Sequence, residues 1–125
     1  MSIAGIQITT DLELVEMNTA DYSAISQAVG GYIEHIELSG DYAGYSLYVH
    51  EEGKLQGLPF NDIASAIWER SFGRNTDYIL GNVVVVSSTT DDEGNELPLT
   101  DDQVENFLAL TQTVMIADAE HDYFS

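Results

Sequence analysis

Residues 78–88 read YILGNVVVVSS, and the four consecutive valines in this stretch decide how the rest of the chain is arranged. β-Branched residues favour extended backbone, and a run without polar alternation offers no side that is suited to water. Gly81 and Asn82 come before the valines and serines follow them, as is typical of a strand bounded by turns. The pattern predicts a strand that is buried on both faces in the middle of a sheet.

Length and composition predict one folded domain over residues 1–125. Hydrophobic residues make up 44% of the chain and aromatic residues 10%, so it lacks the low hydrophobicity of disordered proteins. The absence of cysteine excludes disulfides and thiolate sites. The first residues contain no basic signal-like segment, and no apolar run approaches the roughly 18 residues of a membrane span. We therefore expect a soluble, cytoplasmic protein with no membrane partner.

The charge of the chain is strongly negative, with 22 acidic residues, three basic residues and a formal net charge of −19. Binding of nucleic acid through its phosphates requires many Lys and Arg side chains, so direct nucleic-acid binding is excluded. A negative surface attracts basic partners instead. We therefore expect the partner to be a basic protein.

The first part of the chain predicts a strand or hairpin followed by a helix. Apolar and polar residues alternate over residues 3–16, which indicates an edge strand or an opening hairpin. Thr19 or Asp21 can cap a helix that runs to about Val29, where two glycines stop it.

Two strands are then expected, at residues 32–38 and 45–50. The sequence Glu-Glu-Gly-Lys at 51–54 predicts a tight turn in which Gly53 supplies a positive φ. Residues 55–57 would then return along 45–50.

The second part of the chain predicts one helix before the valine strand and one helix after it. Asn61 or Asp62 can cap the first, which ends near Phe72, and an acidic loop at 89–98 leads to a capping box at 100–103. The core stripe of the last helix is expected to be Val104, Phe107, Leu108, Thr111 and Met115. The prediction is a single α+β domain, with a mixed or antiparallel sheet of four or five strands and three helices in the order β-α-β-β-α-β-α.

Several segments in this order resemble a family of small domains of unknown function that phages, plasmids and actinobacterial genomes encode. The segments are VGGYIEHIEL (29–38), LYVHEEGKLQGLPFN (47–61), ILGNVVVV (79–86) and DDEGNELPLTDDQVENFL (91–108). The resemblance spans about residues 13–110 and implies a mobile-element origin without a particular mechanism. This chain departs from the family pattern in its insertion at 41–44 and in its greater acidity.

No motif for a metal, a cofactor or catalysis is present. Aligning Gly94 with the glycine of an EF-hand places threonines at the two ends of the calcium loop, where acidic ligands are required. The three histidines lack the H-x-x-x-H spacing of zinc sites, and no serine lies in a G-x-S-x-G elbow. We therefore expect a protein that is not an enzyme, with no catalytic residue, metal ligand or cofactor.

Two residues are candidates for binding a small ligand. Asn61 follows a Gly-Leu-Pro step, where its side chain can face a ligand or cap the next helix. Tyr48 clusters with Tyr42 and Tyr45 near a glycine-rich bend, where tyrosines provide contact area at an interface or complete the core. These residues support the alternative function, a small-molecule or nucleotide-binding module.

The candidates for binding a protein partner are acids that lie close together in the sequence. They are Asp91, Asp92, Glu93, Glu96, Asp101, Asp102 and Glu105, which can form one face with Glu51 and Glu52. We expect a non-enzymatic interaction protein of a phage-type mobile element that binds a basic surface on a host protein. In its sharpest form it is a DNA mimic that inhibits a nucleic-acid-binding or defence protein. Adaptation to high salt and simple solubility are alternative explanations of the charge, and the oligomeric state stays open, with a homodimer as one option.

Overall fold

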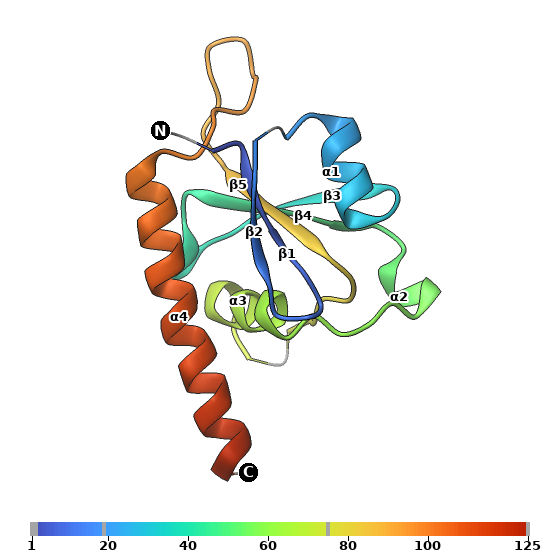
Figure 1. Ribbon diagram of the computed structural model, residues 1–125, viewed down its shortest axis with the longest axis vertical. Coiled ribbons are helices and arrows are strands. Elements are labelled where there is room, and N and C mark those ends of the chain that lie inside the picture. The colour runs from blue at the N-terminus through green and yellow to red at the C-terminus, as the bar shows by residue number, and fades with distance from the viewer. Residues whose placement is uncertain (1–2, 19, 75, 125) are drawn as a thin grey trace.

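The structure is a computed structural model that describes residues 3–18, 20–74 and 76–124, with side chains up to Met115. Five strands form one sheet in the order β2-β1-β5-β4-β3, and every neighbouring pair is antiparallel (Figure 1). The strands are β1 (Gly5–Ile8), β2 (Leu14–Met17), β3 (Ile33–Glu37), β4 (Tyr45–His50) and β5 (Val83–Ser87). The predicted α+β domain is confirmed, with the hairpin β1–β2 at its start.

Three longer helices cover the two faces of the sheet (Figure 1). Helix α1 (Tyr22–Val29) packs on one face, and α3 (Asp62–Phe72) and α4 (Asp101–Phe124) pack on the other. Two short elements complete the fold, a 3₁₀ turn η1 (Gly40–Tyr42) and a single-turn helix α2 (Gly53–Gln56).

Strand β5 is the central strand, as the valine run predicts. It pairs with β1 on one side and with β4 on the other, and all five of its residues are buried. Val83 and Val85 belong to the core beneath α3 and α4, while Val84 and Val86 belong to the smaller core beneath α1. Because each face is covered by helices, both sets of side chains have to be apolar.

The predicted helix caps are confirmed. The Asp21 carboxylate accepts a hydrogen bond from Ala24 N at 2.8 Å, and Thr19 lies outside the described residues. At the start of α4, Thr100 Oγ1 accepts from Gln103 N at 3.1 Å and Gln103 Oε1 accepts from Thr100 N at 2.8 Å. This reciprocal pair is the capping box, and it fixes where α4 begins.

The hairpin expected after β4 is wrong. Residues 53–56 form α2 instead of a turn and a returning strand, and Leu55 is 88% exposed on it. The positive φ belongs to Gly57, at 63°, and not to Gly53. The reason is tertiary, because β3 and β5 already pair with the two sides of β4.

The stripe expected on α4 is partly wrong. Phe107 and Thr111 are fully buried, but Leu108 is 39% exposed and Met115 is 36% exposed. Val114 is buried in their place. The buried positions follow the i, i+4, i+7 spacing of a narrow stripe, so α4 rests on the sheet along one line and leaves its flank open.

Candidate functional site

The segment between β5 and α4 forms a loop that projects from the body of the protein (Figure 1). Its two arms are joined by backbone hydrogen bonds, from Leu97 N to Thr89 O at 3.0 Å and from Asp91 N to Asn95 O at 2.8 Å. The loop is therefore an ordered extension of the sheet's end and carries its acidic residues away from the core.

Seven of the nine predicted partner-binding acids gather at this end of the molecule. Four are exposed on the loop and three are exposed at the start of α4, which directly follows it. We call this group the acidic end; it consists of Asp91, Asp92, Glu93, Glu96, Asp101, Asp102 and Glu105.

Asp91 shapes the tip of the loop. Its Oδ1 accepts hydrogen bonds from Asn95 N and Glu93 N, both at 2.9 Å, and these backbone donors hold the pKa of Asp91 below its usual range. The Asp91 carboxylate thus accepts hydrogen bonds from the backbone of its own turn. Within the described residues no cluster of acids and histidines has the arrangement of a metal site.

Tyr48 ties the acidic loop to the sheet. Its hydroxyl donates a hydrogen bond to the Glu96 carboxylate, and its ring lies 5.1 Å from that of His35. Burial, and then the hydrogen bond to Glu96, raises the pKa of Tyr48. The predicted ligand-binding residue Tyr48 therefore anchors the loop.

The raised pKa values of two tyrosines, Tyr42 and Tyr48, are expected to make the folded protein less stable at alkaline pH. Burial raises the pKa of Tyr42, which is fully buried, as it does that of Tyr48. A raised pKa means that the folded protein holds the proton more tightly than the unfolded chain. The resulting stabilisation is complete below about pH 10, the ordinary tyrosine pKa, and is lost as the pH rises above it.

We expect the free energy of unfolding to fall above pH 10, by up to about 1.4 kcal/mol per pH unit for Tyr42. Urea unfolding between pH 8 and 12 measures this slope. Tyr42→Phe and Tyr48→Phe should each make it shallower, whereas Tyr22→Phe, at an exposed position, should not change it. An identical slope in all three variants would contradict the assignment.

The prediction that Asn61 binds a ligand is corrected by its burial. Asn61 is fully buried, and its Nδ2 donates to Ile8 O at 3.1 Å and to Gly81 O at 2.9 Å. Its Oδ1 accepts from Ala64 N at 2.9 Å and so caps α3. Both polar atoms are engaged inside the protein and no exposed surface remains for a ligand.

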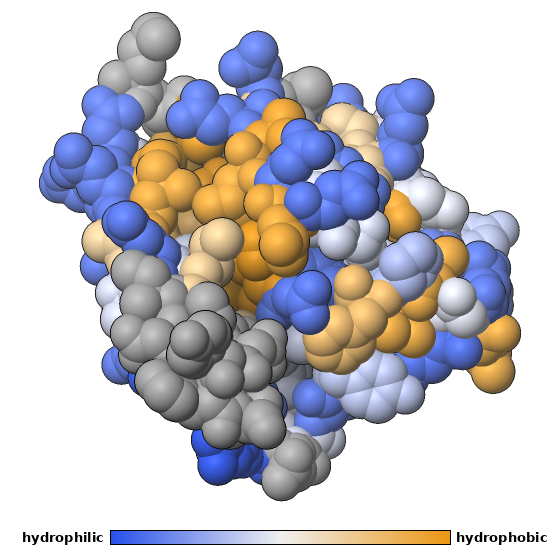
Figure 2. Space-filling view, turned by 60° about the horizontal axis from the view of Figure 1, so that its bottom comes forward, coloured by the Kyte–Doolittle hydropathy of each residue, from blue (hydrophilic) through white to orange (hydrophobic). Residues whose placement is uncertain are grey.

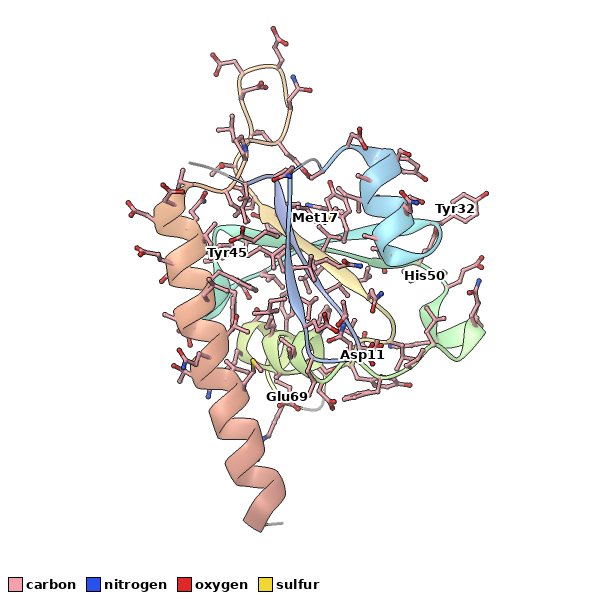
Figure 3. The ribbon with its side chains drawn as sticks, in the orientation of Figure 1. Asp11, Met17, Tyr32, Tyr45, His50 and Glu69 are labelled. Carbon is pink, nitrogen blue, oxygen red and sulfur yellow. The ribbon has the colours of Figure 1, made fainter. Side chains whose placement is uncertain are left out.

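Glu51 and Glu52 do not join the acidic end. They follow His50, at the end of β4 that lies near α2, whereas Tyr45, at the other end of β4, lies beside α4 (Figure 3). Tyr45 pairs with Ser87 at the end of β5 from which the acidic loop departs. The predicted single face that includes Glu51 and Glu52 is therefore wrong, because the length of β4 separates them from the other seven acids.

The structure contains a pocket of about 230 Å³ that the sequence did not indicate. We call it the α2 pocket, since α2 forms one wall. Val49 and Ile79 are buried in its lining, and the half-buried Trp68 from α3 lies beside them. Its residues come from β3, the end of β4 with α2, α3 and the segment before β5, so no local motif marks it.

Charged residues surround the α2 pocket. Lys54 forms an ion pair with Asp77, and its Nζ lies 4.6 Å from the centre of the Tyr78 ring. The hydrogen bond from Lys54 lowers the pKa of Asp77. Glu34 and Glu51 also line the pocket, so its carboxylates outnumber its one lysine and a phosphate would be repelled. The lining of the α2 pocket therefore disfavours a phosphate group.

The surface also has an apolar side. Figure 2 shows a patch of hydrophobic side chains on one face of the molecule. Leu108 and Met115 are the large exposed hydrophobic residues in the described part of α4. The surface therefore has an apolar flank on α4 in addition to the acidic end.

Comparisons with known proteins identify a family but no characterised relative. No curated protein and no solved structure matches the chain. In the described part of the chain, no helix has the length and apolar character needed to cross a membrane. A family model described as Domain of unknown function (DUF3846) matches residues 1–112 of the 125. The chain therefore belongs to the DUF3846 family of domains of unknown function.

Proposed function

We propose that this chain is a non-enzymatic interaction protein of a phage-type mobile element, and that it binds a basic surface on a protein in the host cytoplasm. The observation that supports this proposal is the acidic end, where seven exposed carboxylates gather on ordered backbone at one end of the sheet. The three basic residues, Lys54, Arg70 and Arg74, lie in other parts of the sequence.

The structure of the acidic end favours electrostatic binding of a basic partner. Exposed carboxylates attract a basic partner over a distance of about one Debye length and raise the rate of encounter. The turn at Asp91 and the hydrogen bond between Tyr48 and Glu96 restrict the loop before a partner arrives, which reduces the entropy lost on binding. Asp101 and Asp102 lie in the first turn of α4, where the helix dipole favours negative charge.

The sharpest form of the proposal is DNA mimicry. A net charge of −19 over an accessible surface of 7308 Å² is about one charge per 385 Å². Duplex DNA carries about one charge per 100 Å², taking one charge per 1.7 Å along a rod about 20 Å wide. Averaged over the whole surface, the charge density of the protein is too low to imitate DNA. Mimicry therefore depends on the acidic end, in which seven acids fall within residues 91–105.

Competition with labelled duplex DNA tests the proposal. The full chain is titrated into complexes of a fluorescent duplex with each of a panel of basic host DNA-binding proteins. We expect it to displace the duplex from at least one of them, and the displacement to weaken steeply between 50 and 300 mM salt. A lack of salt-sensitive binding to any member of the panel would contradict the proposal.

Two variants with equal changes in charge locate the binding surface. Asp92→Asn/Glu93→Gln/Glu105→Gln removes three charges from the acidic end, and Asp11→Asn/Glu13→Gln/Glu16→Gln removes three exposed charges from the β1–β2 hairpin. Because each exposed ion pair contributes up to about 1 kcal/mol, we expect the first variant to bind roughly tenfold more weakly than the second. Equal weakening of both would point to net charge alone and would overturn the role of the acidic end.

A further inference from the structure

We infer that the α2 pocket receives the side chain of an arginine from the basic partner. This inference rests on the proposed function, because it assigns one specific contact to the same partner. It starts from three properties of the pocket: its size, its lining and the sign of its charges.

The size and lining suit one long side chain. The pocket has a volume of about 230 Å³, which is below the roughly 300–1,000 Å³ of pockets that hold drug-sized ligands. Val49, Ile79 and Ile36 give it apolar surface, against which the methylene groups of an arginine can pack. Trp68 adds an aromatic ring, on which a guanidinium stacks favourably, whereas the Tyr78 ring is already in contact with Lys54.

The charges suit a cation. Lys54 is paired with Asp77, so that pair is neutral as a unit. Glu34 on β3 and Glu51 after β4 contribute two further carboxylates, both of them on exposed residues. Glu34 pairs across the sheet with Val49, which places it next to the apolar lining. A guanidinium is weakly hydrated and binds carboxylates through two parallel hydrogen bonds, so it fits this combination better than an ammonium group.

Trp68 allows the inference to be tested directly. It is the single tryptophan of the chain and it lines the pocket, so intrinsic fluorescence reports on occupancy. The probe is N-acetyl-arginine amide, and the control is N-acetyl-citrulline amide, which has nearly the same shape and no charge. We expect a saturable change with the arginine probe at about 1 mM, a weaker one with the lysine analogue, and none with citrulline. A linear response, or equal responses to arginine and citrulline, would overturn the inference.

Matched variants distinguish binding in the α2 pocket from a general effect of the net charge. Glu34→Gln/Glu51→Gln should weaken binding of the arginine probe at least tenfold, whereas Glu13→Gln/Glu16→Gln, which removes the same charge from exposed residues elsewhere, should not. Equal weakening by both pairs would overturn the pocket assignment. The two proposals can fail separately. If only the acidic-end variant loses DNA competition and Trp68 does not respond to arginine, the proposed function is retained and the assignment of the α2 pocket is overturned.

Discussion

Asn61→Ala is expected to lower the free energy of unfolding by about 3–5 kcal/mol. The change removes the cap of α3, which contributes about 1 kcal/mol, and it removes the donor to two buried carbonyl groups. Each buried carbonyl left without a donor costs about 1–3 kcal/mol. Since a domain of this size is stable by only about 5–15 kcal/mol, the loss is a large part of the total. Urea unfolding followed by circular dichroism measures it.

Two further variants assign the effect to its causes. Asp21→Ala removes an exposed cap of the same geometry from α1 and should cost only about 1 kcal/mol. Asn61→Asp keeps the capping oxygen but turns a second oxygen toward the carbonyls of Ile8 and Gly81, so it should destabilise at least as much as alanine. If Asn61→Asp were as stable as the wild type, the contacts of the amide nitrogen would contribute nothing and the account of Asn61 would be wrong.

Phe107→Ala is expected to cost about 3–5 kcal/mol, the usual range for a phenylalanine removed from a core. Phe107 is fully buried, and its ring lies 5.7 Å from that of Tyr42 and 5.5 Å from that of Tyr45. These three rings join α4 to η1 and to the first residue of β4. Loss of the Phe107 ring leaves a cavity that the two tyrosines cannot fill, because Tyr45 is held by its hydrogen bond to Gln103 O at 2.6 Å.

Leu108→Ala is the control for Phe107→Ala. The helical periodicity of the sequence places both residues in the core, whereas the structure leaves Leu108 39% exposed. We expect Leu108→Ala to cost about 1 kcal/mol or less, as do most substitutions at exposed positions. Equal losses of stability in a urea series would mean that α4 is rotated about its axis relative to the structure.

The acidic end and the core depend on each other through a small number of contacts. Tyr48 lies on β4 next to the buried Val84 and Val86, and its hydroxyl reaches Glu96 on the projecting loop. Gln103 belongs to the capping box and also donates to Ser87 at the end of β5. The proposed binding surface is therefore supported by the most buried strand of the fold.

The sequence by itself determined the features that depend on neighbouring residues. The valine run specifies a central strand because none of its apolar side chains is favoured at a solvent-exposed surface. β5 is buried on both faces, as predicted. Asp21 and the Thr100–Gln103 pair specify helix starts because a cap bonds to a backbone group three residues away. The acidic end was predictable for the same reason, since its seven acids are close in the chain.

The tertiary structure decided everything that depends on which segments meet. Residues 53–56 became a helix because both sides of β4 were already paired, and Glu51 and Glu52 were carried away from the other acids by the length of that strand. Asn61 was predictable as a cap, but its bonds to Ile8 and Gly81 require two distant segments to converge on it. The α2 pocket likewise exists only where four separated segments come together. Hydrogen bonds and cavities between segments far apart in the chain follow from packing, and no local pattern of residues encodes them.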